Sequence, residues 1–247
     1  MLILFALVFC IQFYLEGLHR TRLLPVLLLG LVLVASVTLP FSRQLPRSVQ
    51  RSLCFLPIPV DVGVRADAEE SWDWRIRIRD AVLPQVPHYL LLGKGLAFTR
   101  EELDYSMAQS AGTMTTISAD QIGLALAGDY HNGPLSVVIP FGIWGVATFL
   151  WFLAAGIRVL YRNYKYGDES LRIVNTCLFA MFVGKALVFI FLTGGLNSDL
   201  QLLIGYLAFN ISLNGGVAKR APAPVPEAAE ASRFAGMLPR PRSVAGR

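Results

Sequence analysis

Five long apolar runs constrain what this chain can fold into more than any other feature of its sequence. They cover residues 1–18, 23–41, 134–157, 173–192 and 200–217. Each run approaches the roughly 20 residues that a helix needs to cross a ~30 Å hydrocarbon core. Charged residues make up only 16% of the chain, against roughly 25% in ordinary soluble domains. We therefore expect an all-α polytopic membrane protein with about five transmembrane helices in a lipid bilayer.

Basic residues in the short connections set the expected orientation. They follow the first, third and fifth runs, and the positive-inside rule places all three sets in the cytoplasm: His19, Arg20, Arg22, Arg158, Arg162, Lys165, Lys219 and Arg220. The chain then divides into a transmembrane hairpin (1–41), a large extracytoplasmic, periplasmic segment between the second and third helices (42–133), three transmembrane helices (134–217) and a cytoplasmic tail (218–247). The tail is rich in Ala and Pro and is expected to be disordered.

The first apolar run begins at the amino terminus, on the outer side, with no polar segment before it. Its basic residues follow the run instead of preceding it, which is not the order of a signal peptide. We interpret this start as a sign that further helices precede Met1 in a larger protein. The chain is then the carboxy-terminal half of that protein.

The outer segment contains the stretch "SWDWRIRIRDAVL", in which apolar and charged residues alternate. The alternation by itself favours a strand with Arg75, Arg77 and Arg79 on one face. The length of the segment also allows an amphipathic helix on the membrane surface, with Arg75 and Arg79 on one face and Arg77 elsewhere. The arginines either attract anionic lipid or bind a diphosphate through their planar forks.

The stretch "LLLGKGLAF" places Lys94 between Gly93 and Gly95. A tight turn explains the two glycines without any ligand, whereas Lys94 would add charge to an anion site. Residues 99–128 are polar but show no metal-ligand spacing, and the three cysteines show neither zinc nor disulfide spacing. We expect no metal site.

His131 and Asn132 stand directly before the third long apolar run, in "DYHNGPLSVV". A histidine at this depth can exchange a proton near neutral pH, while Asp129 or Asn132 orients it or binds a sugar hydroxyl. The same residues also fit a helix start, with Asp129 or Asn132 as the cap and Pro134 in the first turn. The two interpretations are compatible.

Lys185 lies in the middle of the fourth apolar run. A charge there costs at least ~2.5 kcal/mol on insertion scales and usually faces a partner or a wet cavity. We expect Lys185 to face inward in a structural role, with snorkelling or a place on a lipid-diphosphate path as the alternatives.

Taken together, "DWRIRIRDAVLPQVPHYLLLGKGLAF" and "HNGPLSVVIPFGIWGVATFLWFL" resemble the conserved half of the O-antigen ligase and O-antigen polymerase family. The family carries an arginine before a Pro-containing GxG segment, then a His-Asn pair that opens a helix running to GxxG. The matching positions here are Arg75, Gly93, Gly95, His131, Asn132, Gly142 and Gly145. The resemblance covers residues 72–157. The family often has an aromatic residue where Arg79 stands, and about twice as many helices.

The resemblance implies a multi-pass glycosyltransferase of the bacterial inner membrane that takes an undecaprenyl-diphosphate-linked glycan as donor and a glycan or lipid as acceptor. It implies no cofactor, no metal and no nucleic acid. Arg75 would neutralise the diphosphate and His131 would act as general base, while Arg77, Arg79, Lys94 and Asn132 would help to bind substrate. The motifs do not separate a ligase, which transfers finished glycan to lipid A core, from a polymerase. A transporter or structural membrane protein is the alternative from another class.

Overall fold

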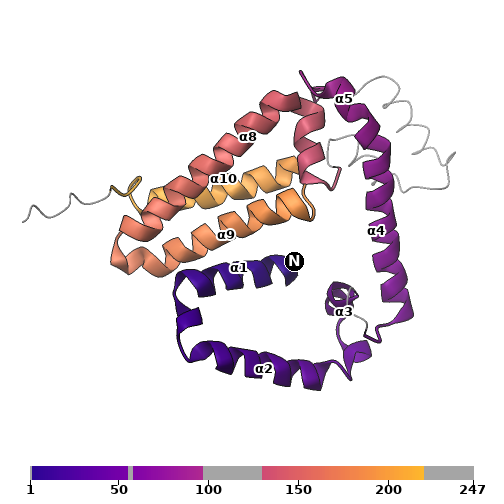
Figure 1. Ribbon diagram of the computed structural model, residues 1–247, viewed down its shortest axis with the longest axis vertical. Helices are drawn as coiled ribbons and strands as arrows, with labels where there is room; N and C mark the ends of the chain where they lie inside the picture. The colour runs from indigo at the N-terminus through magenta and orange to yellow at the C-terminus, as the bar shows by residue number, and fades with distance from the viewer. Residues whose placement is uncertain (1, 55–57, 97–129, 220–247) are drawn as a thin grey trace, which may run out of the picture.

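The computed structural model describes residues 2–54, 58–96 and 130–219 (Figure 1). Every regular element in these ranges is a helix, which confirms the all-α expectation for them. Beside the longer helices there are four short 3-10 turns, η1 (Leu18–Arg20), η2 (Ser42–Gln44), η3 (Leu83–Gln85) and η4 (Glu169–Leu171). Three parts of the sequence analysis lie outside the described residues. They are the polar stretch 99–128, for which no metal site is expected, the residue Asp129, and most of the tail.

Helices α8 (Gly133–Tyr166), α9 (Arg172–Phe191) and α10 (Leu196–Leu213) form a bundle, with α1 (Leu2–Leu15) packed along α9 (Figure 1). Phe182 is fully buried at the centre of the bundle. Its ring lies against Gly156 of α8, so close that a Cβ at that position would collide with it. Gly184 likewise leaves room for Val8 of α1. Small residues at these crossings let the helices approach closely, as in membrane helix pairs.

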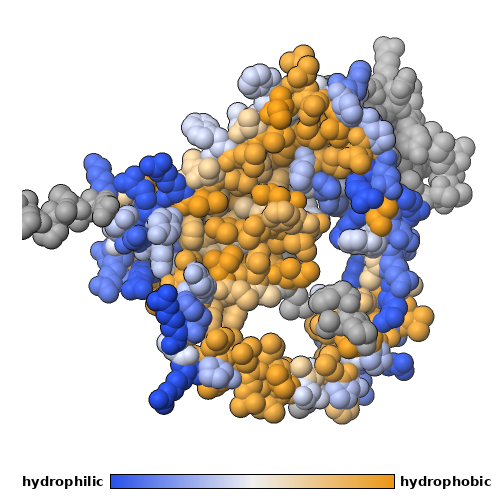
Figure 2. Space-filling model, in the orientation of Figure 1, coloured by the Kyte–Doolittle hydropathy of each residue, from blue (hydrophilic) through white to orange (hydrophobic). Residues whose placement is uncertain are grey.

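Helices α8 and α9 are long and apolar enough to cross a membrane, α9 together with the η4 turn. Helix α1 and helix α2 (Leu23–Thr38) are apolar but shorter than a span. Figure 2 shows apolar residues over the outside of the bundle and over α2. By length and composition the structure thus supports two spans. The expected five spans and the extracytoplasmic place of residues 42–133 stay predictions.

Two helix boundaries differ from the sequence-based expectation. Helix α8 continues to Tyr166, so the basic residues expected in a connection form its last turns. Helix α10 begins at Leu196, four residues before the expected run. Asp199, which falls between the fourth and fifth expected apolar runs, is therefore in the first turn of a helix and is 4% exposed.

Helix α8 is broken near its beginning. Pro140 lies inside the helix, and Gly142 has φ 62° and ψ −160°, which is not helical. The loop after α5 (Val86–Tyr89) supplies the missing hydrogen bonds: Lys94 N–H donates to Ile139 O (2.7 Å), Gly95 N–H to Pro140 O (2.9 Å) and Ile143 N–H to Leu90 O (2.6 Å). Non-helical backbone at membrane depth needs this kind of protein partner.

The GxG stretch is the tight turn that its two glycines predicted. Gly93 has φ 76° and Gly95 has φ 81°. Residues with a Cβ rarely adopt such positive φ angles, whereas glycine does so at no steric cost. A Cβ on Gly93 would lie 2.2 Å from Pro140 O, and one on Gly142 would lie 2.8 Å from Gly93 N. The two backbones touch because both positions are glycine.

Of the two alternatives for the stretch around Arg77, the helix is confirmed and the strand is wrong. Residues 62–82 form helix α4 (Val62–Val82), which begins where the Asp61 side chain accepts the N–H groups of Gly63 and Val64. Its buried side chains, Val64, Trp74 and Val82, recur at helical spacing with the half-buried Ile78. The alternation covers only eight residues, whereas the helical period governs the whole element. The short α3 (Arg47–Leu53) packs beside its start.

The connection α1–α2, the connection α8–α9 and the end of α10 lie at one end of the bundle (Figure 1). The Tyr164 hydroxyl of α8 donates to Leu15 O of α1 (2.9 Å) at this end. Four asparagines also join the helices here through amide hydrogen bonds of 2.8–3.0 Å: Asn163, Asn175, Asn210 and Asn214. We call it the basic end, because the arginines and lysines of these connections gather there.

Candidate functional site

Helix α4 brings Trp74 against His131, which is 57 residues further along the chain. The two rings meet edge to face with centroids 5.0 Å apart. One and two turns along α4, Ile78 and Val82 pack against Leu135 and Ile139 at the start of α8. This apolar contact holds α4 beside the residues that open α8.

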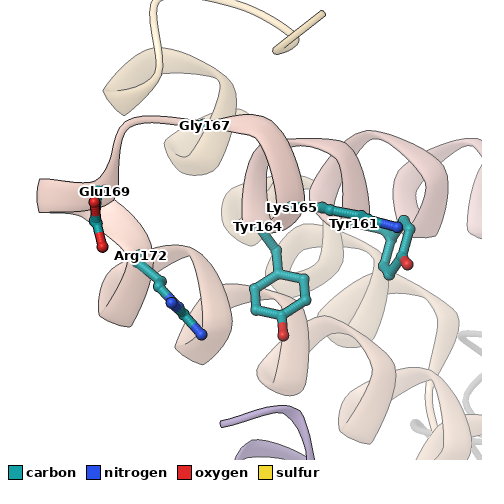
Figure 3. A pocket seen from close by; sticks show the side chains of 6 residues that line it. All are labelled: Tyr161, Tyr164, Lys165, Gly167, Glu169 and Arg172. Atoms are coloured by element: carbon teal, nitrogen blue, oxygen red, sulfur yellow. The ribbon is translucent and has the colours of Figure 1, made fainter. Parts of the chain in front are cut away.

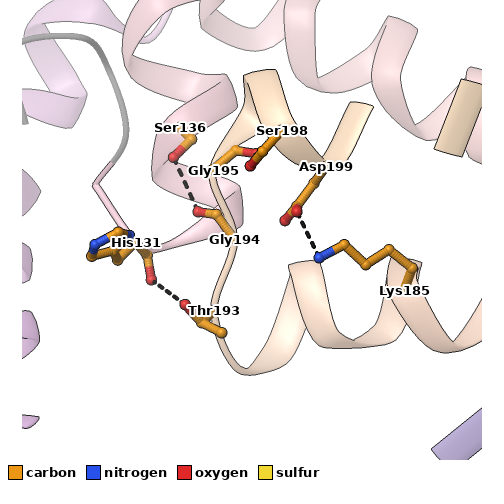
Figure 4. A network of polar contacts seen from close by, with 8 residues as sticks. All are labelled: His131, Ser136, Lys185, Thr193, Gly194, Gly195, Ser198 and Asp199. Carbon is orange, nitrogen blue, oxygen red and sulfur yellow. Dashed lines mark hydrogen bonds and ion pairs between the residues drawn. The ribbon is translucent and has the colours of Figure 1, made fainter. Parts of the chain in front are cut away.

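His131 occupies an unusual backbone conformation, with φ 48°. Its carbonyl oxygen accepts a hydrogen bond from the Thr193 hydroxyl (3.3 Å), on the turn between α9 and α10 (Figure 4). The Ser136 hydroxyl donates to Gly194 O of the same turn (3.4 Å). Positive φ at a non-glycine residue costs of order 1–3 kcal/mol and persists where neighbouring contacts over-determine it.

Asn132 caps helix α8. Its side-chain oxygen accepts the N–H of Leu135 (3.2 Å), and Pro134 stands in the first turn. The helix-start interpretation of this pair is therefore confirmed for Asn132. Because the cap uses the oxygen of the Asn132 amide as an acceptor, it does not involve the NH₂ group, which can donate to another partner.

Arg75 follows Trp74 on α4 and is half-buried. Its Nε is buried and has no hydrogen-bond partner within the described ranges. A buried guanidinium nitrogen without a partner is costly, because it has lost water and gained nothing. Such a group is suited to receive an anion.

The structure does not bring the other two arginines to the same place. Arg79 is exposed and holds the carboxylate of its neighbour Asp80 through Nε and Nη2 at 3.0 and 2.8 Å. Arg77 is exposed on another face of α4. Arg77 is two positions from Arg75 and therefore points in a different direction. Arg79 lies one turn further along α4, but its guanidinium is turned to Asp80.

Lys94 lies on the GxG turn, against the break in α8 at Ile139. Burial lowers the pKa of its ammonium group below the usual 10.5, because desolvation disfavours the charged form. Its contact with Ile139 lies two helical turns from Asn132 along α8.

Tyr130 is half-buried directly before His131 and packs on the cluster formed by Val82, Leu135 and Ile139. Burial raises the pKa of its hydroxyl, and the nearby Tyr89 raises it further. Tyr130 therefore stays a neutral hydroxyl at physiological pH and is able to donate a hydrogen bond.

Lys185 has a partner that the sequence analysis missed. Its ammonium group lies 2.6 Å from a carboxylate oxygen of Asp199 on α10 (Figure 4), with side chains 13% and 6% exposed. The inward, structural role expected for Lys185 fits this ion pair. The signal was available, since Asp199 is the acid nearest in sequence to a lysine inside an apolar run, and such lysines need partners.

The described residues contain no group of three or more His, Cys, Asp or Glu side chains placed to hold a metal ion. The three cysteines are free thiols. What the described residues offer is the His131 ring and the Asn132 cap amide at the start of α8, and on α4 the desolvated Arg75 next to Trp74, which contacts His131. No family model, no curated protein and no solved structure matches this chain.

Proposed function

We propose that the protein is a multi-pass membrane glycosyltransferase of the O-antigen ligase or polymerase type, in the bacterial inner membrane. It would act in cell-surface polysaccharide biosynthesis on an undecaprenyl-diphosphate-linked glycan. The observation that supports this proposal best is the Nε of Arg75, which is buried without a hydrogen-bond partner among the described residues, one residue from the tryptophan that packs on His131. A diphosphate needs a cation, and an attacking hydroxyl needs a base.

In the proposed reaction the acceptor hydroxyl oxygen attacks the anomeric carbon of the lipid-linked sugar. His131 takes the hydroxyl proton as the new C–O bond forms. The bond from the anomeric carbon to the diphosphate oxygen breaks, and its electron pair leaves with the undecaprenyl diphosphate. Arg75 stabilises the charge that develops there. Charge and protons balance without a further reactant.

The other four candidate residues take secondary roles in this proposal. The free NH₂ donors of Asn132 would hold a sugar or acceptor hydroxyl beside His131. Arg77 and Lys94 would add positive charge around the diphosphate from a distance. Arg79 is held by Asp80 and would contribute least.

The test uses the full-length gene product in membrane vesicles with a fluorescent undecaprenyl-diphosphate glycan. His131→Ala and Arg75→Ala are compared with Arg77→Ala and Arg79→Ala as matched controls on the exposed faces of α4. We expect release of undecaprenyl diphosphate to fall about 10²–10⁴-fold in the first two, and less than tenfold in the controls. Turnover that is indifferent to His131 and Arg75, at equal protein levels, would contradict the proposal.

A transporter is the second candidate, and two observations favour it. A buried Lys185–Asp199 pair lies between helices, and α8 is broken at Gly142; both features recur on ion and proton paths in membranes. The two proposals differ in whether activity requires a membrane gradient. Transport would depend on a membrane gradient and on Asp199, whereas glycan transfer would proceed in leaky vesicles.

A further inference from the structure

The basic end of the bundle carries a pocket of about 460 Å³ between the last turn of α8 and the start of α9. Figure 3 shows Tyr164 standing between Arg172 on one side and Lys165 with Tyr161 on the other. The complete lining is Tyr161, Tyr164, Lys165, Gly167, Glu169 and Arg172. The pocket lies at the opposite end of α8 from His131, so it is separate from the candidate site above.

The pocket is lined by two cations and one acid, and its cations form no ion pair within the part of the chain that the structure describes. The ion pairs that the described ranges contain join Arg79 to Asp80 and Lys185 to Asp199, so Lys165 and Arg172 have none there. The Lys165 ammonium group lies 5.7 Å from the Tyr161 ring centre and 5.6 Å from that of Tyr166. These aromatic faces steady the ammonium without neutralising it.

We propose that this pocket binds the headgroup of an anionic glycerophospholipid. The phosphate diester would bond the Arg172 guanidinium, and the Lys165 ammonium group would add positive charge from the other side of Tyr164. Headgroup hydroxyls would donate to the Glu169 carboxylate and bond the Tyr161 hydroxyl. A lipid is favoured over a soluble phosphate because the pocket lies where α8 ends and α9 begins, and these are the two described helices long enough to cross a membrane. Tyrosines and basic residues at a helix end mark headgroup depth.

The proposal rests on α8 and α9 crossing a membrane and is independent of glycan transfer. It is tested with the full chain in nanodiscs that contain phosphatidylglycerol in phosphatidylcholine, with native mass spectrometry counting the retained lipids. The variant is Lys165→Gln with Arg172→Gln, and the matched control is Arg47→Gln with Arg51→Gln on α3. Both variants lose the same charge, and all four side chains are exposed.

We expect the pocket variant to retain phosphatidylglycerol about tenfold less than wild type, with the control unchanged and phosphatidylcholine unaffected in both. Arg172→Gln alone, at the exposed start of α9, should lose about threefold and serves if the double variant misfolds. Equal losses in pocket and control variants would overturn the proposal in favour of general attraction. Displacement of the lipid by glycerol 1-phosphate at millimolar concentration would overturn the commitment to a lipid.

Discussion

Helices α9 and α2 are both strongly apolar, yet they differ in what covers them. In α9, Phe182 and Phe189 are 0% and 1% exposed, because α1, α8 and α10 pack around that helix. In α2, Leu31 and Val32 are 65% and 60% exposed, and the whole helix is apolar around its circumference. A helix of the second kind is stable only in lipid or against another chain. Two apolar helices therefore depend on different surroundings: α9 on the neighbouring helices of the bundle, and α2 on lipid or another chain.

The polar side chains show the same contrast. In the bundle, Lys185 pairs with Asp199, and Asn175 bonds three other asparagines or their backbones across helices. In α2, Ser36 and Thr38 donate only to carbonyls of their own helix. Polar contacts between helices thus fix the arrangement of the bundle, whereas the position of α2 depends on its apolar surface. Each prediction below tests one side of this contrast.

Removing one partner of the buried ion pair should have the largest effect. Asp199→Ala leaves the Lys185 ammonium group buried without an anion, which costs about 3–5 kcal/mol. The measurement is the unfolding free energy of the purified chain in detergent. The double variant Lys185→Met with Asp199→Leu removes both charges and should recover most of the loss. If the double variant is no more stable than Asp199→Ala, the pair does not act as a unit.

Truncation of one large side chain in each helix compares α9 and α2 directly. Phe182→Ala opens a cavity in the bundle and should cost about 3–5 kcal/mol. Leu31→Ala, at a side chain that touches little protein, should change the unfolding free energy by less than about 0.5 kcal/mol. A comparable loss in both variants would show that α2 is covered by protein, for example by a second copy or by preceding helices.

The GxG turn that packs on α8 allows a similar comparison between two glycines, one in close backbone contact and one in open space. Gly93→Ala combines a left-handed backbone, costing about 1–2 kcal/mol, with overpacking against Pro140, costing about 1–3 kcal/mol. Gly205→Ala on α10 is the control, because a Cβ there meets nothing within 4 Å and Ala favours the helix by up to about 1 kcal/mol. A shift of the same sign in both would contradict the docking of the turn on α8.

The sequence predicted the helices better than their ends or their breaks. Apolar runs located α1, α2, α8, α9 and α10, because burial in lipid or in protein demands the same residue types. The break at Gly142 was missed, since it depends on residues 90–95 supplying hydrogen bonds from far along the chain. For the stretch that forms α4, the helix alternative was right and the strand alternative was wrong, because alternation over a short window is weaker evidence than the helical spacing of Trp74 and Val82.

The residues of the candidate site were proposed from residue type and stay a prediction. The contact that brings α4 to His131 is made by Trp74, which the sequence analysis did not single out as a contact. The separation of Arg79 arises from its pairing with Asp80, a local choice that a list of charges does not reveal. Asp199 was placed in a loop because the start of α10 was set four residues too late.

The smallest effect is expected at the exposed turn between α8 and α9, where Asp168 accepts the N–H of Ser170 at 2.8 Å. Hydrogen bonds to Ser170 lower the pKa of this carboxyl below its usual 3.8. A lowered pKa in the folded state stabilises the fold at neutral pH, and this contribution is lost as the pH falls through the folded-state value. Asp168→Asn keeps a cap but removes the charge, so the small difference in Tm from wild type at pH 7 should shrink as the pH falls below the usual carboxyl value of 3.8. A difference that stays constant across this range would assign the effect of Asp168 to the shape of the cap and not to its charge.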